Sequence, residues 1–394
     1  MTIALTDLSQ HRIKLFPFTL TRPVADLRVG ILTIREKWEK YFHQPIDFLT
    51  TTELVGKYPM PAGEIHLMIN GAICPEAGLV EAIKSLNNKE ILRKEGLFIA
   101  AKGLVDTKEP TVNLQGYKPV DYHGGCTVIN RSWDLFTHNK EQLTADFKLL
   151  TDGRVSQEIT DPHTIVYGKE NVFLEDGVDI KAAILNAEEG PIYLAKNSVI
   201  QEGATIRGPF ALGENSRINM NAKIREGVTI GSNCKIGGEV SNSIVYGHSN
   251  KAHDGYLGNA VVGEWCNLGA DTNNSNLKNN YDEVKAWDFE SQQFIKTGLQ
   301  FCGLFMGDHS KTAINTALNT GTTIGVCSNV FGNGFPPTFV PSFSWGGSDQ
   351  LVPYRFEKAI ETAKKVWARK NIEQTEEDEK ILKTIFERSI KHQS

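Results

Sequence analysis

The amino-acid sequence predicts three parts in chain order: an α/β domain, a triangular parallel β-helix and a C-terminal helical extension. The main observation is that aliphatic residues recur at every sixth position through the middle of the chain. In addition, the N-terminal part mixes short apolar runs with helical patterns, and helical spacing returns near the C-terminus. We place the parts at residues 1–155, 160–335 and 336–394. A chain of 394 residues is long enough for two or three cores.

The first part alternates between two kinds of secondary structure. The segments IALTD, DFLTT, IHLMING and GLFIAA are short apolar runs that predict strands. The segments LRVGILTIREKWEKYF and AGLVEAIKSLNN have helical spacing and lie between these runs. Strands that alternate with helices predict an α/β domain with a partly parallel sheet.

The second part is identified by its period. Eight aliphatic residues stand six apart: Leu194, Ile200, Ile206, Leu212, Ile218, Ile224, Ile230 and Ile236. A period of six fits neither a helix nor a pair of strands. It predicts a solenoid in which each hexapeptide forms one side, three sides close a coil of about 18 residues, and the aliphatic side chain points inward. Glycine or asparagine is expected at the tight corners.

The period is interrupted further along the chain. It slips by two at Ile244, resumes with Tyr256, Val262 and Leu268, and returns with Met306, Leu318, Ile324 and Val330. Residues 271–298 do not keep the period, and we expect them to form a loop that projects from the stack.

Two helices are predicted after the stack. Residues 334–347, GFPPTFVPSFSWGG, are typical of a linker. Apolar residues then recur at helical spacing: Phe356, Ala359, Ile360, Ala363, Val366 and Trp367. A second helix is predicted at 375–391. We expect these helices to cap the open end of the solenoid or to cover a neighbouring subunit.

Composition excludes several classes of protein. There are 42 Lys and Arg against 47 Asp and Glu, with no basic tract, so no nucleic-acid partner is expected. Apolar runs are too short for a membrane span, and the start of the chain lacks the features of a secretory signal. The six cysteines form no CxxC pair, which argues against a zinc site or a disulfide framework. These features predict a cytoplasmic protein without a membrane partner.

Several motifs carry a resemblance to a known family. The segment LFPFTLTRPVADLRVGILTIREKWEK resembles the opening of sugar-1-phosphate nucleotidyltransferases. Joined to a hexapeptide solenoid, it is similar to the bifunctional N-acetylglucosamine-1-phosphate uridylyltransferase/glucosamine-1-phosphate N-acetyltransferase family. TNNSNLK, TGLQFCG, GDHSKTAINT and GFPPTFVPSFSWGG are typical of a divergent bacterial branch with a shortened nucleotidyltransferase-like N-terminal domain. The resemblance implies that the β-helix is left-handed.

The resemblance also implies an acetyltransferase site on the solenoid. The segment HDGYLGNAVVGEWCNLGA supplies His253, Tyr256 and Asn267 at the family's spacing. His253 would be the base that takes a proton from the sugar amine, since the pKa of an imidazole lies near working pH. Tyr256 and Asn267 would hold the sugar and its phosphate. The alternative for His253 alone is a corner histidine that faces solvent without a role.

Two further binding residues and three departures belong to the same comparison. Arg225, in KIREGV, matches the family's phosphate-binding arginine, and Asn276, in NSNLK, matches a substrate-binding asparagine. Ser241 or a neighbour stands where the family has a lysine. Ile314 and Phe331 stand where small residues line the acetyl-CoA groove. The resemblance therefore leaves the sugar and the acyl donor open.

The nucleotidyltransferase motifs are degenerate. That chemistry needs a glycine-rich loop around the phosphates, a basic residue and carboxylates that hold Mg²⁺. Here TDLSQHR replaces the loop, Val24 occupies the position of the lysine, and Ala72 that of the metal-binding aspartate. Mg²⁺ remains possible only through other carboxylates.

Other residues could still line a nucleotide pocket or supply a carboxylate: Arg12, Arg22, Arg28, Lys37, Asn70, Asp26 and Asp134. Each of these is more often an ordinary surface or capping residue.

The sequence thus predicts a two-part sugar-phosphate enzyme. Its β-helix would be a homotrimeric, acetyl-CoA-dependent N-acyltransferase for an amino-sugar phosphate, and its N-terminal nucleotidyltransferase domain would be degenerate. One alternative is a sugar-1-phosphate nucleotidyltransferase, uridylyl or thymidylyl, whose solenoid only assembles the oligomer. Another is a non-catalytic sensor that binds sugar nucleotides.

Overall fold

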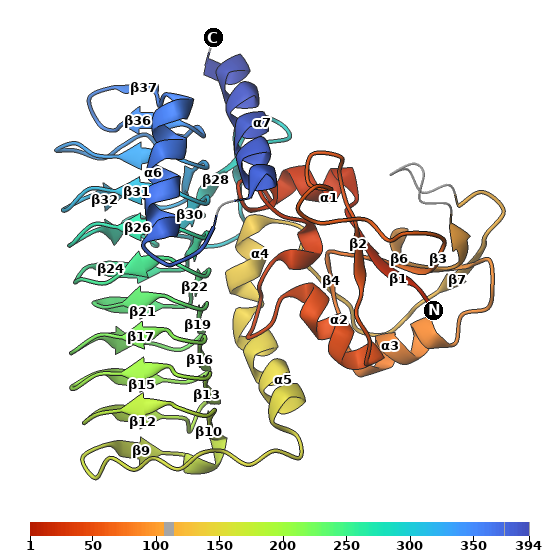
Figure 1. Ribbon diagram of the computed structural model, residues 1–394, viewed down its shortest axis with the longest axis horizontal. Coiled ribbons are helices and arrows are strands. Elements are labelled where there is room, and N and C mark those ends of the chain that lie inside the picture. The colour runs from red at the N-terminus through yellow and green to blue at the C-terminus, as the bar shows by residue number, and fades with distance from the viewer. Residues whose placement is uncertain (106–113, 374, 394) are drawn as a thin grey trace.

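The computed structural model describes residues 1–105, 114–373 and 375–393, and shows an α/β domain packed against the side of a β-solenoid (Figure 1). The predicted order of an α/β domain, a hexapeptide-repeat left-handed β-helix and C-terminal helices is confirmed. Within these described ranges, no helix has the length and apolar character needed to cross a bilayer.

A six-stranded sheet forms the centre of the N-terminal domain. Its strands, in spatial order, are β2 (Asp47–Leu49), β1 (Ile3–Thr6), β3 (Ile65–Asn70), β6 (Leu97–Val105), β5 (Glu90–Lys94) and β7 (Lys118–Asp121). Strand β1 is parallel to β2 and β3, whereas β6 is antiparallel to β3 and β5. The predicted partly parallel sheet is therefore confirmed. Beside it, β4 (Ile73–Cys74) pairs with β8 (Thr127–Val128).

In its described residues, 1–105 and 114–155, the domain also has five helices and two short 3-10 turns: α1 (Ser9–Lys14), η1 (Phe18–Leu20), η2 (Val24–Asp26), α2 (Ile34–Phe42), α3 (Ala77–Lys84), α4 (Ser132–Thr137) and α5 (Asn139–Thr151). Helix α2 shows how the local sequence sets its ends. Thr33 and Glu36 form a reciprocal capping box at its start, and His43 ends it with a left-handed φ of 54°. Its buried face inserts Ile34 and Trp38 into the domain core.

The solenoid has three faces. The first face contains β10 (Val172–Leu174), β13 (Ile192–Leu194), β16 (Phe210–Leu212), β19 (Val228–Ile230), β22 (Ile244–Val245), β25 (Val261–Val262), β30 (Leu304–Met306), β33 (Thr322–Ile324) and β35 (Phe339–Val340). The second face contains β11 (Asp179–Ile180), β14 (Val199–Ile200), β17 (Arg217–Ile218), β20 (Lys235–Ile236), β23 (Asn250–Lys251), β26 (Asn267–Leu268), β31 (Lys311–Thr312), β34 (Asn329–Val330), β36 (Ser344–Gly346) and β37 (Leu351–Pro353).

The third face contains β9 (Ile165–Tyr167), β12 (Ile184–Asn186), β15 (Thr205–Arg207), β18 (Lys223–Ile224), β21 (Glu239–Ser241) and β24 (Tyr256–Gly258). It continues with the pair β27 (Asn273–Asn274) and β32 (Ala317–Leu318), of which β27 lies against β24. A 3-10 turn, η3 (Lys169–Asn171), connects β9 of the third face to β10 of the first face. The domain boundaries drawn from the sequence stay predictions.

The regular part of the repeat behaves as predicted. All eight aliphatic residues from Leu194 to Ile236 point into the solenoid and are at most 2% exposed. Asparagines occupy the corner between the first and second faces, where Asn197 and Asn215 both have a φ of 56°. Asparagine tolerates this left-handed backbone better than most residues.

The irregular coil differs from the prediction. Ile218 pairs with Ile236 eighteen residues later, but Ile236 pairs with Lys251 after only fifteen. Val245 and Leu257 are the inward residues of this region, so the expectation for Ile244 and Tyr256 is wrong by one position. Ile244 is buried instead against the N-terminal domain, and Tyr256 faces outward. Lys251 occupies an inward position of the second face that is aliphatic in the coils directly before and after it, at Ile236 and Leu268.

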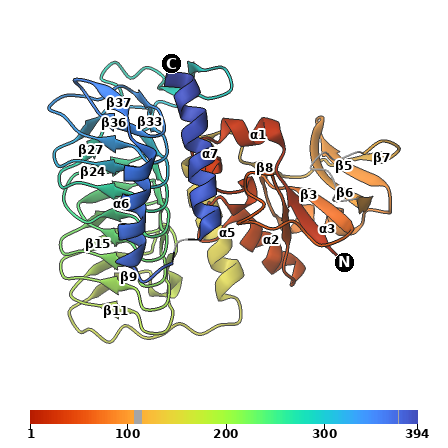
Figure 2. The ribbon, with the colours of Figure 1, turned by 45° about the horizontal axis from the view of Figure 1, so that its top comes forward.

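The N-terminal domain covers the first face of the solenoid (Figure 2). Asn139 Nδ2 donates to Gly227 O over 2.9 Å, and Thr229 Oγ1 donates to Gly30 O over 3.0 Å. The rings of Phe136 and Phe305 stack with centroids 6.2 Å apart. Apolar side chains of the first face therefore belong to the core of the domain.

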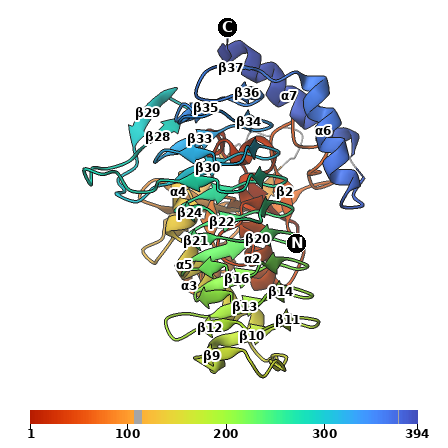
Figure 3. The same cartoon turned by 90° about the vertical axis from the view of Figure 1, so that its left-hand side faces the viewer.

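The predicted projecting loop is a hairpin. Strands β28 (Lys285–Asp288) and β29 (Gln293–Lys296) leave the coil stack and pair antiparallel (Figure 3). Arg131 pairs with Asp288 over 2.5 Å, and Phe16 packs edge-on against Phe289. The hairpin therefore fastens the N-terminal domain to the solenoid.

The C-terminal helices lie along the solenoid and do not close its end. Helices α6 (Phe356–Ala368) and α7 (Glu376–Gln393) pack against the corner between the first and second faces. Helix α7 also reaches the N-terminal domain, where Asp378 pairs with Lys57 over 2.9 Å. The expected cap at the open end is therefore wrong, because the apolar stripe of α6 meets an aromatic corner of the solenoid.

Candidate functional site

Three of the expected binding residues meet on the third face. The register places Glu239 beside Tyr256, so the outward side chains of adjacent coils align. Asn276 Nδ2 donates to Tyr256 Oη over 3.0 Å and to Asn259 Oδ1 over 2.7 Å. Arg225 lies in the coil before, with its guanidinium 3.7 Å from the Glu239 carboxylate. We call these five residues the third-face cluster.

The cluster combines a cation, an anion and neutral hydrogen-bonding groups. Burial, and then the charge of Glu239, raise the pKa of the Tyr256 hydroxyl above its usual value, so this group stays protonated. Arg225 is exposed and can exchange its carboxylate partner for a phosphate. Ser241, which the sequence placed at or next to the position of the family's lysine, lies on the same strand as Glu239. Sequence reasoning missed Glu239 and Asn259, because their alignment depends on the shortened coil.

His253 lies apart from this cluster, at a notch in the corner between the second and third faces. The notch has a volume of about 880 Å³, and its lining includes Met220, Gly237, His253 and Asp271. The chain passes from Ile236 to the next inward residue, Val240, in four positions, whereas regular coils use six. The missing residues leave the space that His253 borders.

Glycine is required on the floor of the notch. A Cβ atom on Gly237 would lie 2.4 Å from Ala252 O. Gly238 has a φ of +70°, and its Cβ would lie 2.6 Å from Gly255 O and 2.8 Å from Lys251 Nζ. The adjacent coils approach too closely here for any side chain.

Asn267 stands on a different face from the cluster. It belongs to β26 on the second face, between Asn250 and Lys311 of the neighbouring coils. Residues eleven apart, such as Tyr256 and Asn267, occupy different sides of a triangular coil. Within one chain the structure therefore brings together Arg225, Tyr256 and Asn276, but it does not bring Asn267 to them.

Lys251 is a second residue that sequence reasoning missed. Its side chain is 2% exposed inside the solenoid, and Nζ donates to Gly237 O over 3.1 Å and to His253 O over 2.8 Å. Burial lowers its pKa to about 8, and the charges of Asp254 and Asp271 oppose this shift. Its spacing of six from Val245 and from Leu257 is the signal that would have identified an inward lysine.

The expected nucleotide ligands of the N-terminal domain are engaged inside the protein. Arg12 donates to Asp7 Oδ2 over 3.3 Å and to Arg22 O over 3.1 Å. Arg22 is buried in an ion pair with Asp308 of the solenoid. Asn70 is fully buried and donates to Phe98 O over 3.0 Å.

The remaining candidates also have internal partners. Arg28 lies 3.7 Å from Glu36, and Lys37 is buried in an ion pair with Asp146. Asp134 accepts two backbone N–H groups at the start of α4, which makes it a capping residue. Asp26 accepts the Tyr58 hydroxyl over 3.2 Å, and burial raises its pKa to about 6.

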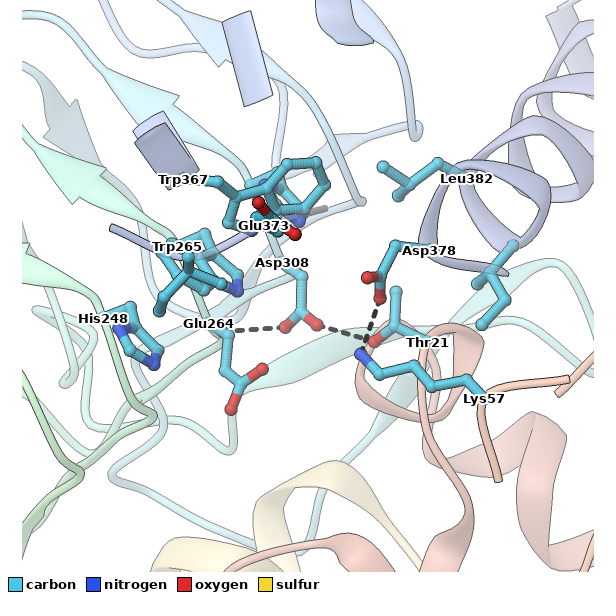
Figure 4. Close-up of a pocket in the computed structure, with 13 residues that line it drawn as sticks. Thr21, Lys57, His248, Glu264, Trp265, Asp308, Trp367, Glu373, Asp378 and Leu382 are labelled. Carbon is cyan, nitrogen blue, oxygen red and sulfur yellow. Dashed lines mark hydrogen bonds and ion pairs between the residues drawn. The ribbon is translucent and has the colours of Figure 1, made fainter. Parts of the chain in front are cut away.

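A separate cavity of about 200 Å³ lies where the N-terminal domain, the solenoid and the C-terminal helices meet (Figure 4). Asp308 accepts the Thr21 hydroxyl over 2.6 Å and Glu264 N over 2.8 Å. His309 packs edge-on against Trp367, and burial lowers its pKa to about 3. The GDHSKTAINT motif thus supplies the contacts that hold the three parts together at this cavity.

Two family models match the chain. Residues 3–155 match a model described as sugar nucleotidyl transferase. Residues 212–240 match a model described as bacterial transferase hexapeptide (six repeats). The resemblance predicted for the two parts is confirmed by these matches.

Two curated relatives are named as bifunctional proteins. The bifunctional sugar-1-phosphate nucleotidylyltransferase/acetyltransferase of Sulfurisphaera tokodaii is 28% identical over 248 residues, which cover 61% of this chain and 54% of the relative. The bifunctional protein GlmU of Methanococcus aeolicus is 25% identical over 257 residues, which cover 61% and 52%. The chain thus spans about half the length of the curated relatives it matches.

Two solved structures each align with about half of this chain. An Arabidopsis UDP-N-acetylglucosamine acyltransferase overlaps with a TM-score of 0.30 and 13% identity, over 54% of this chain and 77% of that one. The polySia-specific acetyltransferase NeuO overlaps with a TM-score of 0.28 and 15% identity, over 51% and 98%. These scores are too low to transfer a function.

Proposed function

We propose that this chain, whose two parts match sugar nucleotidyl transferases and hexapeptide transferases, is an acetyl-CoA-dependent N-acyltransferase for an amino-sugar phosphate. The observation that carries the proposal is the third-face cluster, which joins Arg225, Tyr256 and Asn276, while His253 stands apart from it on the corner between the second and third faces. A phosphate-binding cation, hydroxyl-binding groups and a base are the parts that this reaction needs.

Each residue has a distinct task in the proposed reaction. Arg225 binds the sugar phosphate, while Tyr256 and Asn276 orient the sugar. The His253 imidazole accepts a proton from the amine as the nitrogen attacks the thioester carbonyl. The new C–N bond forms, the C–S bond breaks, and the proton passes to the departing thiolate. No covalent enzyme intermediate is involved.

The strip above His253 is compatible with an acyl-thioester donor. Ile314 and Phe331 lie at this corner two and three coils further on, and both are exposed. Phe331 packs edge-on against Trp345, with ring centroids 5.3 Å apart. This apolar strip suits the slender arm of acetyl-CoA, although it is bulkier than the groove of the family.

A homotrimer would complete the site. The first face is covered by the N-terminal domain, so only the second and third faces are free to meet another subunit. Asn267 stands on the second face and Tyr256 on the third. A cyclic trimer that joins the second face of one subunit to the third face of the next would bring Asn267 and the third-face cluster to one groove.

The N-terminal domain does not fit nucleotidyl transfer in this proposal. Val24 and Ala72 are buried apolar residues at the lysine and metal positions, and the arginines are paired internally. Within residues 1–105, 114–373 and 375–393, no group of three His, Cys, Asp or Glu side chains is placed to hold a metal ion. We therefore assign no step to Mg²⁺.

The match over residues 3–155 favours one alternative, sugar-1-phosphate nucleotidyl transfer with the solenoid as a scaffold. Release of pyrophosphate from a nucleoside triphosphate and a hexose 1-phosphate would select it. Binding of sugar nucleotides without either reaction would select a non-catalytic sensor.

The deciding experiment measures acyl transfer from acetyl-CoA to a panel of amino-sugar phosphates. His253→Ala should lower kcat by about 10²- to 10⁴-fold, the usual loss for a positioned base. The KM for acetyl-CoA should stay unchanged, because the base contacts the amine. Arg225→Ala should instead raise the KM for the sugar phosphate.

His163→Ala is the matched control, because His163 is an exposed histidine of the first coil. It should retain wild-type kinetics. The proposal fails if His253→Ala keeps wild-type turnover, or if the wild type transfers no acyl group to any member of the panel.

A further inference from the structure

Lys251 carries an inference that rests on the proposed function. Among the inward residues of the second face, Ile218 and Ile236 precede it and Leu268 follows it, so an aliphatic side chain would fit the column. A buried ammonium is costly unless its donors are satisfied. The position of its two acceptors indicates what this lysine does.

Regular corners of the solenoid are linked by backbone hydrogen bonds. The carbonyl two residues after an inward residue accepts an N–H from the corner of the next coil. Glu202 O accepts from Asn221 N over 3.0 Å, and Ala270 O accepts from Asn315 N over 2.8 Å. These bonds fix each corner against its neighbour.

The corner of His253 departs from this pattern. Its equivalent carbonyl is His253 O, but the next coil donates instead to Asp254, from Asp271 N to Asp254 O over 3.0 Å. Lys251 Nζ supplies the donor to His253 O over 2.8 Å. The corner that borders the notch thus has a side-chain bond to His253 O beside its backbone bond to Asp254 O.

The second bond of Lys251 reaches the shortened corner. Nζ also donates to Gly237 O over 3.1 Å, on the opposite side of the notch. Gly238 leaves the space for this ammonium, because a Cβ atom there would lie 2.8 Å from Nζ. One buried cation therefore links the floor of the notch to the residue that borders it.

We propose that Lys251 is a positioning residue for the acyl-transfer reaction. It holds the backbone of His253 at a fixed place over the notch by bonding His253 O and Gly237 O. Lys251 does not touch substrate. Its effect passes through His253, since a general base loses efficiency when it is displaced by as little as an ångström.

The test compares Lys251→Met with the wild type in acyl transfer and in hydrogen exchange. Methionine fills the same volume inside the solenoid without a donor. We expect kcat to fall by about 10- to 100-fold, while the KM values for acetyl-CoA and the sugar phosphate stay unchanged. Deuterium uptake should rise at residues 252–256, and the melting temperature should be equal or higher because a buried charge is removed.

Lys102→Met is the matched control. Lys102 Nζ also donates to two carbonyls, those of Leu86 and Lys84, but it lies in the N-terminal sheet. It should change neither kcat nor uptake at residues 252–256. Lys251→Gln, which keeps a donor on a shorter side chain, should give an intermediate kcat.

Three results would overturn the inference: wild-type kcat and uptake in Lys251→Met, a change confined to KM, or loss of folding, which would make Lys251 a purely structural residue. If the wild type shows no acyl transfer, the proposed function fails. The exchange comparison still decides whether Lys251 holds the corner.

Discussion

Several charged residues of the N-terminal domain form buried ion pairs that stabilise the fold. Arg12 forms an ion pair with Asp7, Lys37 with Asp146, and Arg22 with Asp308. Removing one partner of such a buried pair leaves the other charge unpaired, which typically costs about 3–5 kcal/mol. These side chains therefore stabilise the fold, and a nucleotide would have to compete with carboxylates already in place.

Asp26 gives the stability of the protein a recognisable pH dependence. Burial raises its pKa from 3.8 to about 6, partly opposed by Arg22 and Arg35 and reinforced by Glu264 and Glu36. Between about pH 4 and pH 6 the folded protein therefore binds this proton more tightly than the unfolded chain. The free energy of unfolding contributed by Asp26 is present below this window and is lost as the pH rises through it.

Asp26→Asn should remove this contribution. Urea denaturation of wild type and variant across pH 4 to 7 would measure it, and the difference between their unfolding free energies should change in the stated window. Asp121→Asn, on an exposed part of β7, serves as the control. Parallel profiles for wild type and Asp26→Asn would contradict the assignment.

At the scale of elements, the six-residue period identified the regular coils but not the shortened one. Ile244 and Val245 are both aliphatic and both buried, and periodicity cannot tell which one faces the solenoid interior. The N-terminal domain buries Ile244 from outside, so the distinction depends on tertiary contacts. The same one-residue error hid Lys251.

Long-range partners explain the other errors. Arg22 and Asp308 are 286 residues apart, and no local pattern links them. The candidate site residues Arg225, Tyr256 and Asn276 were predicted from motifs, whereas their neighbour Glu239 can be identified only from the register of the coils. Helix α6 was found by its spacing, but its place on the solenoid depends on the aromatic corner that it meets.

Helix α6 should be fastened mainly by Trp367. This side chain is 4% exposed and packs edge-on against Trp265 and His309, with centroids 6.0 and 5.0 Å away. Trp367→Ala should lower the free energy of unfolding by about 3–5 kcal/mol in chemical denaturation. Trp345→Ala, at a tryptophan that is 43% exposed, is the control and should cost clearly less. Equal losses would show that α6 is held elsewhere.

At the scale of the whole molecule, two of the three solenoid faces are available for assembly. The lower third face exposes Ile165, Tyr167 and Ile184 on adjacent strands β9 and β12. Apolar groups that gather on one exposed face are typical of contacts between subunits. The N-terminal domain occupies the remaining face and would project outward from such an assembly.

Light scattering should therefore give a mass of about three times 43.7 kDa. Ile184→Glu should shift the mass toward that of one chain, because it places a charge in the contact. Val155→Glu, at an exposed position between the domain and the solenoid, should leave the trimer intact. A monomeric wild type at micromolar concentration would contradict a site shared between subunits.

The side chains along the corner between the first and second faces differ from coil to coil. One position per coil has the same left-handed backbone, so only the side chain changes along the line: Asn197, Asn215, Asn233, His248, Trp265, His309, Cys327 and Phe343. The asparagines stand in the earlier coils of the stack, where Asn197 and Asn215 are exposed and Asn197 Nδ2 donates to Asn215 Oδ1 over 3.4 Å. In the three coils that follow, the rings of His248, Trp265 and His309 stack on one another. Helices α6 and α7 pack against these aromatic residues and against Phe343. The side chain that each coil presents at this corner thus determines where the C-terminal helices attach to the solenoid.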